Sequence, residues 1–331
     1  MAVWVDSALR GQLTADRGCC EGGCRGDWLT FEFAWICWIF MTVRVPENVA
    51  ELVARLLQTV QDCGPCVVAY SGGVDSAVVA KAAVLQWGGQ ALAVTAVSPS
   101  LSAADRELAR REAERIGIVH VELPTDEFLR DEYRRNAGDR CFWCKDTLYQ
   151  TIEVLLQRYP GRCVLNGANL DDVGDHRPGM QAALQHGVRS PLIESGLRKS
   201  DVRQLAALWG LHAADKPASP CLSSRIAWGV EATAERTVRI DQAEIFLREL
   251  LQCRELRVRL EQNELARIEL PLEYVGSAAV SPQRERIAER LRELGFRQVT
   301  LDLEGFRSGG LNSRLPQLVT LGGIKSAGGT D

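Results

Sequence analysis

The clearest chemical signature in the chain is the run Ser71-Gly72-Gly73-Val74-Asp75-Ser76. An apolar stretch that indicates a strand precedes it, and a stretch that indicates a helix follows. Adjacent glycines let backbone N–H groups approach phosphate oxygens, serines donate hydrogen bonds, and a helix N-terminus adds a favourable dipole. The run therefore predicts a turn that holds phosphates and their Mg²⁺. The expected ligands are Ser71, Gly72, Gly73, Asp75 and Ser76.

This turn lacks the lysine and hydroxyl residue that end a Walker A loop. SGGVDS instead resembles the PP-loop of the ATP pyrophosphatases. The resemblance implies that ATP is cleaved between its α and β phosphates and that a substrate becomes adenylated. A plain glycine turn that caps a helix is the competing interpretation.

Three cysteines define a second candidate centre. Cys141 and Cys144 form a C-x-x-C pair, and Cys221 lies in the polar run at 216–225. Three thiolates can hold a [4Fe–4S] cluster and leave one iron open for an exogenous sulfide. Two alternatives stay open: a zinc site completed by a fourth ligand, such as Cys163 or a histidine, or inert buried thiols.

Charged residues accompany both candidate centres. Lys145 directly follows the C-x-x-C pair and is a candidate counter-charge for thiolates, with a solvated lysine as the alternative. Arg225 follows the third cysteine and is expected to meet an anionic substrate group. Asp171 and Asp172 are candidates to hold the metal or the nucleotide, or alternatively to cap a helix.

A further C-x-x-C pair, Cys63 and Cys66, matches the dithiol sequence of thioredoxins. A reactive dithiol of that kind needs its first cysteine at a helix N-terminus after a strand, where the dipole lowers its pKa. Here Cys63 ends a predicted helix and Cys66 begins a predicted strand. We therefore interpret this pair as structural.

The elements that must position these residues alternate between strand and helix. Alternation of this kind predicts right-handed crossovers and a doubly wound parallel sheet, whose ligands bind beyond the carboxyl ends of the strands. The predicted strands are 66–70, 91–97, 118–123 and 163–166, and the predicted helices are 47–61, a second one to Trp87, and 103–116. A charged helical segment, 126–157, is expected to be interrupted around 138–144.

The sequence after Gly229 indicates a different, α+β arrangement. It contains a long helix at 234–251, strands at 255–260 and 265–270, a helix at 282–294 and a strand at 297–301. The expected domains are a PP-loop domain at 41–228 and a small α+β substrate or oligomerisation domain at 229–307. A flexible tail is expected at 308–331, and residues 1–40 are interpreted as a disordered or spurious extension, because they lack periodicity.

Composition bounds the class of protein. The chain has 331 residues, 46% of them hydrophobic, which favours two domains. A formal net charge of −4 argues against a protein that mainly coats nucleic acid. Eleven cysteines in a chain of this length indicate a reduced, cytoplasmic protein, and no apolar run approaches the roughly 20 residues that span a bilayer.

Four runs together resemble the LarE family of sulfur transferases, over nearly all of residues 41–312. The family acts in the synthesis of the nickel-pincer nucleotide of lactate racemase and related enzymes. The runs are SGGVDS at 71–76, NGANLDD at 166–172 continuing as DHRPG at 175–179, KPASPCLSSR at 216–225, and DLEGFRSG at 302–309.

The resemblance implies adenylation of a carboxylate on pyridinium-3,5-biscarboxylic acid mononucleotide and its conversion to a thiocarboxylate. In one branch of the family the cysteine that matches Cys221 gives up its own sulfur and becomes dehydroalanine, and that branch lacks the C-x-x-C pair. The pair in this sequence favours the branch that bears a cluster. Candidates for the mononucleotide phosphate are Arg257, Arg259 and Arg307, although a solvated strand edge explains the first two equally well.

The expected cofactors are therefore ATP, Mg²⁺ and a [4Fe–4S] cluster. The expected partners are the mononucleotide, a sulfide or sulfur donor, and further copies of the chain in a homo-oligomer, with no nucleic acid and no membrane. The main alternative is a PP-loop tRNA thiolase, which needs a basic surface or zinc ribbons that we do not find. Two further interpretations are an NAD or GMP synthetase-like enzyme and a nucleotide-binding or iron–sulfur carrier protein.

Overall fold

The computed structural model describes residues 46–173, 178–215 and 220–307. The chain divides into two units, residues 1–47 and residues 48–331, and both sheets and the candidate site belong to the second unit. The predicted extension at 1–40 and the predicted tail at 308–331 lie outside the described residues. The predicted boundary between residues 228 and 229 stays a prediction.

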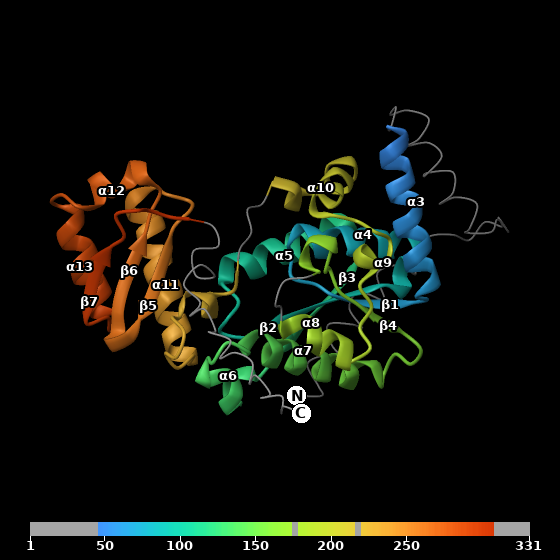
Figure 1. The fold of residues 1–331 in the computed structure, drawn as a ribbon, viewed down its shortest axis with the longest axis horizontal. Helices are drawn as coiled ribbons and strands as arrows, with labels where there is room; N and C mark the ends of the chain where they lie inside the picture. The colour runs from blue at the N-terminus through green and yellow to red at the C-terminus, as the bar shows by residue number, and fades with distance from the viewer. Residues whose placement is uncertain (1–45, 174–177, 216–219, 308–331) are drawn as a thin grey trace, which may run out of the picture. The chain divides into compact units, whose positions relative to one another are not determined.

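A parallel four-stranded sheet forms the centre of the first half of this unit (Figure 1). Its strand order is β3-β2-β1-β4, and each neighbouring pair runs parallel. The strands are β1 (Cys66–Ala69), β2 (Leu92–Val97), β3 (Val119–Pro124) and β4 (Cys163–Leu165). The prediction of a doubly wound parallel α/β sheet is confirmed.

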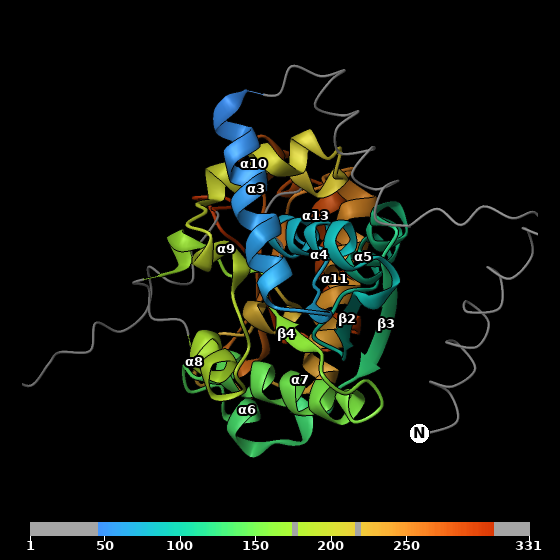
Figure 2. The ribbon, with the colours of Figure 1, turned by 90° about the vertical axis from the view of Figure 1, so that its right-hand side faces the viewer.

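Helices cover both faces of this sheet, with α4 and α5 on one side and α7 on the other (Figures 1 and 2). Helix α5 is capped at both ends: Ser102 accepts the N–H of Asp105, and Gly117 ends the helix with a φ of 80°. The helices are α3 (Glu47–Asp62), α4 (Val74–Trp87), α5 (Ala103–Ile116), α7 (Arg140–Leu156), α8 (Pro178–Gln185), α9 (Pro191–Glu194) and α10 (Lys199–Leu208).

The core of the sheet consists of branched and small side chains, as expected for strands that are buried on both faces. Val67, Leu92 and Val94 of the strands pack against Leu148 and Ile152 of α7. Within the described residues, no helix is both long enough and apolar enough to cross a bilayer.

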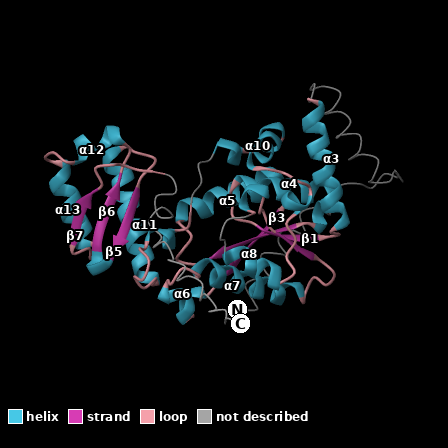
Figure 3. Ribbon diagram, in the orientation of Figure 1, coloured by secondary structure: helices cyan, strands magenta, loops and turns pink. Residues whose placement is uncertain are grey.

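The second half contains a smaller mixed sheet (Figure 3). Its order is β5-β6-β7, with β5 antiparallel and β7 parallel to β6. This confirms the predicted α+β arrangement. The elements are α11 (Ala234–Leu251), β5 (Arg257–Glu261), β6 (Leu265–Glu269), α12 (Leu272–Ala278), α13 (Gln283–Glu293) and β7 (Gln298–Leu301).

The interruption in the charged helical segment lies earlier than predicted. The short helix α6 (Asp131–Arg135) ends at Asn136, which has a φ of 50°, and α7 begins at Arg140. A side chain that hydrogen-bonds locally tolerates this left-handed conformation and stops the helix. The C-x-x-C pair therefore lies in the first two turns of α7 instead of a loop.

Candidate functional site

The phosphate turn follows β1 directly and leads into α4. The hydroxyl of Ser76 donates to the carbonyl of Gly73 over 3.0 Å, and its oxygen accepts the N–H of Ser71 over 3.2 Å. Gly73 occupies the N-cap position of α4 and provides no side-chain cap. The N-terminus of α4 is therefore left for an anionic ligand, as in other helix-terminal phosphate sites.

At two positions of this region the neighbouring atoms leave no room for a side chain, so only glycine fits there. Gly72 has a φ of +69°, and a Cβ there would lie 2.7 Å from the Cβ of Ala109 in α5. A Cβ on Gly167 would lie 2.7 Å from the backbone nitrogen of Ser76. Any side chain at Gly167 would push the loop after β4 away from the phosphate turn.

The loop after β4 meets the turn because β4 lies beside β1 at the point where the strand order reverses. Crevices at such switch points are where α/β sheets bind ligands. From this loop, the Nδ2 of Asn169 donates to the Oδ1 of Asp75 over 3.1 Å. The other oxygen of Asp75 forms an ion pair with Lys199, the first residue of α10.

Asp171 and Asp172 make the contacts of helix caps. Asp172 accepts the N–H of Asn169 over 3.0 Å in a capping box around the short 3₁₀ turn η3 (Leu170–Asp172). Asp171 accepts the N–H of Lys199 over 2.7 Å and pairs with Arg198 at 3.0 Å. These contacts agree with the capping alternative, and a role in holding metal or nucleotide stays a prediction.

The three cysteines of the second centre lie close enough to influence one another. Desolvation of the thiol by the surrounding protein is the largest cause that raises the pKa of Cys141, although part of this residue is exposed, and it is also the largest cause for Cys144. Cys221 raises both pKa values further. Burial, followed by the charge of Glu127, raises the pKa of Cys144 to about 12. All three thiols act on Lys145: burial opposes its charge, yet Tyr149 and the thiols raise the pKa of its ammonium group.

This arrangement can be compared with the metal sites that the sequence suggested. Among the residues that the structure describes, no three His, Cys, Asp or Glu side chains are close enough to hold one metal ion. A zinc site therefore has no support there. A [4Fe–4S] cluster is wider than one ion and takes thiolate ligands, and Cys141 and Cys221 are both exposed to receive it. The trio fits a cluster in donor type, and a cluster held by these three residues stays a prediction.

Hydrogen bonds from several elements bring Cys221 to the C-x-x-C pair. The N–H of Leu222 donates to the carbonyl of Ser100 over 2.9 Å. Because Ser100 follows β2, this hydrogen bond holds the Cys221 segment beside the carboxyl end of that strand. The hydroxyl oxygens of Tyr133 in α6 and Ser223 lie 2.7 Å apart. Asn136, in the elbow between α6 and α7, donates to the carbonyl of Ala227 over 2.8 Å. The elbow that begins α7 therefore also fixes the segment of the third cysteine.

Arg225 has a protein partner in place of the anionic substrate group that was expected. Its Nε lies 3.1 Å from the Oε1 of Glu244 in α11, and its Nη1 donates to the carbonyl of Cys221 over 2.9 Å. Both side chains of the ion pair are buried, 3% and 1% exposed. These contacts favour a role in positioning Cys221.

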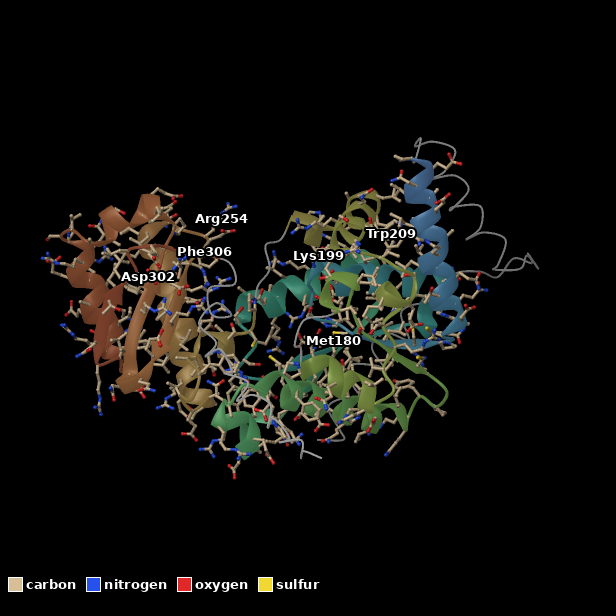
Figure 4. All side chains as sticks on the ribbon, viewed as in Figure 1. Met180, Lys199, Trp209, Arg254, Asp302 and Phe306 are labelled. Atoms are coloured by element: carbon tan, nitrogen blue, oxygen red, sulfur yellow. The ribbon has the colours of Figure 1, made fainter. Side chains whose placement is uncertain are left out.

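The three arginines predicted for a phosphate differ in their surroundings. Arg259 pairs with Glu269 at 3.0 Å and donates to the carbonyl of Ser224, and Arg307 pairs with Glu304. Within the described residues Arg257 makes no ion pair. Its guanidinium lies 5.1 Å from the ring centroid of Phe306, a residue labelled in Figure 4. Burial, followed by the charge of Arg225, lowers the pKa of Arg257 to about 10.

Sequence reasoning missed Glu127, a buried carboxylate beside the thiol centre. Its Oε1 accepts the hydroxyl of Ser98 over 2.5 Å, and its Oε2 makes no hydrogen bond in the described part of the structure. The sequence also provides no indication of Lys199 or Tyr133. No local pattern marks them, because their contacts join segments that are far apart in the chain.

An open cavity of about 510 Å³ lies beyond the carboxyl end of β2, where the sheet topology predicts a ligand. Its lining combines apolar residues with a few charged ones. Among them are Ser98, Arg106, Leu222, Val238 and Asp241.

A parallel sheet of order β3-β2-β1-β4, with SGGVDS joining β1 to a helix N-terminus, defines an α/β protein of the ATP pyrophosphatase class. No protein-family model matches the chain. It is 36% identical, over 81% of its length and 96% of the relative, to pyridinium-3,5-bisthiocarboxylic acid mononucleotide synthase of Lactiplantibacillus plantarum. The chain therefore belongs to the LarE family of that synthase.

Two further relatives match a similar share of the chain. An uncharacterized protein of Synechocystis sp. is 46% identical over 74% of the chain and 91% of the relative. An uncharacterized protein of Methanocaldococcus jannaschii is 26% identical over 73% of the chain and 90% of the relative. The shared region is thus nearly the full length of each relative.

Proposed function

We propose that the protein is an ATP-dependent sulfur transferase of nickel-pincer nucleotide biosynthesis. Its substrate is pyridinium-3,5-biscarboxylic acid mononucleotide, which it adenylates and converts to the bisthiocarboxylic form. The observation that carries this proposal is the convergence of three thiols on Lys145, in a chain 36% identical to the synthase of that product.

Adenylation uses the phosphate turn. A carboxylate oxygen of the substrate attacks the α-phosphorus of ATP, the bond to the bridging oxygen breaks, and pyrophosphate leaves. Backbone N–H groups at the start of α4, with Ser71 and Ser76, are placed to bind the leaving pyrophosphate. Asp75 supplies a carboxylate for Mg²⁺, whose charge offsets that of the phosphates.

Sulfur transfer uses the second centre. Cys141, Cys144 and Cys221 would hold a [4Fe–4S] cluster, which would supply a site for exogenous sulfide. Lys145 stabilises the negative charge of the thiolates, and Arg225 fixes the backbone of Cys221 through its carbonyl. A sulfur nucleophile then displaces AMP from the acyl adenylate, which leaves a thiocarboxylate.

Arg257 is the best candidate among the three arginines for the phosphate of the mononucleotide. Burial, Arg225 and Arg259 lower the pKa of its guanidinium, and Glu244 only partly offsets them. Within the described residues no carboxylate forms an ion pair with Arg257. An anionic ligand would relieve this repulsion. Arg259 and Arg307, which already have carboxylate partners, support the site at its edges.

The test is turnover by anaerobically purified protein with ATP, the mononucleotide and excess sulfide. We expect AMP, pyrophosphate and a thiocarboxylate product, together with iron and acid-labile sulfide in the protein. Cys221→Ser should abolish the product, and Cys63→Ser, which changes a thiol away from this centre, should not. ADP and orthophosphate as products would contradict the assignment.

Intact-protein mass spectrometry then separates the two sources of sulfur. Cluster-dependent transfer leaves the mass of the polypeptide unchanged after many turnovers. A stoichiometric loss of the elements of H₂S from Cys221, which persists in a Cys141→Ser, Cys144→Ser variant, would show that Cys221 is sacrificed.

A further inference from the structure

Three thiols lie together at the amino ends of β1 and β4, whereas the phosphate turn follows the carboxyl end of β1. Cys66 begins β1, Cys163 begins β4, and the two are paired in the register of the parallel strands. The N–H of Cys163 also donates to the carbonyl of Pro65 over 2.9 Å. Cys163 therefore lies beside the run Cys63-Gly64-Pro65-Cys66, which leads from α3 into the sheet.

The thiols of both strands point to the same face of the sheet. Val67 and Val164, which follow Cys66 and Cys163 and are paired with each other, pack in the core that includes α7. Successive side chains of a strand point to opposite faces. The two cysteines therefore point to the face that α4 covers.

Helix α3 brings Cys63 to this face, and its end lies beside β1 and β4 (Figures 1 and 2). The Nε1 of Trp87 in α4 donates to the carbonyl of Val60 in α3 over 3.1 Å, and Gly64, with a φ of +75°, turns the chain into β1. Cys63 then donates a hydrogen bond to Cys163, which is the main cause that lowers the pKa of Cys163 to about 7. Much of Cys163 is thus a thiolate at neutral pH.

The fold selects which two of these thiols can bond. Neighbouring strands lie about 4.8 Å apart and paired side chains of parallel strands project side by side, whereas a disulfide needs Cβ atoms about 3.8 Å apart. Cys66 and Cys163 are held at such paired positions, and Cys66 is fully buried. Cys63 lies outside the strands, and both it and Cys163 are partly exposed, so a small oxidant can reach them.

We propose that Cys63 and Cys163 form a reversible disulfide when the protein meets a hydroperoxide. The thiolate of Cys163 attacks one oxygen of hydrogen peroxide, the O–O bond breaks, and the departing hydroxide takes a proton from solvent. Cys163 is then a sulfenic acid. The sulfur of Cys63 attacks the sulfur of Cys163, the S–S bond forms, the S–O bond breaks, and hydroxide leaves with the proton of Cys63 as water. Two thiols have lost two electrons, and the peroxide has become two molecules of water.

The disulfide ties the end of α3 to the start of β4, which are far apart in the sequence. A cross-link of this kind constrains the unfolded chain, so the oxidised protein should melt at a higher temperature than the reduced protein. The inference does not depend on the proposed sulfur transfer, because neither thiol belongs to the phosphate turn or to the centre around Cys221.

The test is peptide mass spectrometry on the full chain. Reduced protein is exposed to hydrogen peroxide, the remaining thiols are alkylated in denaturant, and tryptic peptides are compared with and without dithiothreitol. We expect the peptide of Cys63 linked to the peptide of Cys163, at a mass two hydrogen atoms below the sum of the two, and its loss after dithiothreitol. Cys253, a buried thiol of the second half, should stay reduced and be alkylated.

Variants identify the partner, because no Lys or Arg separates Cys63 from Cys66 and one tryptic peptide carries both. Cys66→Ala should keep the linked peptide. Cys63→Ala should lose it, and dimedone should then trap the sulfenic acid of Cys163. Oxidation should raise the melting temperature of Cys66→Ala but not that of Cys63→Ala.

Three outcomes would overturn the disulfide. The first is a bond between Cys63 and Cys66 in place of the linked peptides, and the second is a linked peptide that forms only in denaturant. The third is a Cys163 that stays a thiol or a sulfenic acid in the unchanged protein while Cys63 is still alkylated. Each leaves the proposed sulfur transfer standing, because that activity is judged by its products.

Discussion

Arg225 and Glu244 form a buried ion pair, with 3.1 Å between Nε and Oε1, that joins the Cys221 segment to α11. Glu244 also accepts the N–H of Val258 over 3.2 Å and pairs with Arg248 at 2.6 Å. One carboxylate thus connects the reactive segment, a helix and the first strand of the smaller sheet.

We expect Glu244→Ala to lower the free energy of unfolding by about 3–5 kcal/mol, because it leaves the guanidinium of Arg225 buried without a counter-charge. Urea denaturation followed by circular dichroism measures this change. Glu285→Ala is the matched control: its pair with Arg284 is exposed, and its loss should leave the free energy of unfolding nearly unchanged. Equal effects of the two substitutions would refute the structural role of the buried pair.

Gly167→Ala should disrupt the phosphate site from outside the PP-loop. The added methyl group would lie 2.7 Å from the nitrogen of Ser76, so the backbone of one loop must move. We expect the unfolding free energy to fall by about 1–3 kcal/mol, and the affinity for ATP to fall with it. Gly89→Ala, whose new methyl group would have no atom within 4 Å, should change neither quantity. Unchanged ATP binding in Gly167→Ala would mean that the loops can separate without consequence.

The thiols of Cys63 and Cys163 share a hydrogen bond that should make them unequal in reactivity. The hydrogen bond from Cys63 lowers the pKa of Cys163, and the same contact, with burial, raises the pKa of Cys63. Because the thiolate is the nucleophile, iodoacetamide at neutral pH should label Cys163 before Cys63. Peptide mass spectrometry after timed labelling measures both sites. In Cys63→Ala the labelling of Cys163 should shift to higher pH; an unchanged pH profile would argue against the hydrogen bond.

His186 should stabilise the protein on the acidic side of neutrality. Burial opposes its charge, but hydrogen bonds to Asp146 and Glu153, at 2.8 and 2.7 Å, raise its pKa above the ordinary value. A raised pKa in the folded state means that the stabilisation is complete below the unfolded pKa of about 6.5 and is lost as the pH rises through the folded value. The pKa of Asp146 is lowered in the fold, so the carboxylate stays charged well below neutrality.

The measurement compares unfolding free energies at pH 5.5 and pH 8.5. His186→Gln should cost up to about 1 kcal/mol more at the lower pH, because it removes the ion pairs with Asp146 and Glu153 of α7. His212→Gln, at an exposed position, should show no such difference. A larger cost at the higher pH would reverse the predicted sign.

The sequence by itself was sufficient for the strands, for the type of sheet and for the longest helices, whereas it did not indicate the shorter helices α8, α9, α10 and α12. Buried strands of branched residues alternate with amphipathic helices, and helix α5 has the predicted bounds because a serine cap and a terminal glycine are local signals. The start of α7 was predicted too late, because the stop at Asn136 depends on a left-handed conformation that many asparagines do not adopt. The phosphate turn was found because its residues are contiguous.

Tertiary structure alone decided which distant groups share a site. Asp75 and Lys199, Tyr133 and Ser223, and Arg225 and Glu244 come together only once the strand order and the helix packing are set. It also shows the protein contacts of charged residues whose roles the sequence left open: a carboxylate or guanidinium has the same local pattern whether it binds a ligand or a protein partner. The difference lies in the charge that the fold places opposite it, and no periodicity or motif encodes that charge.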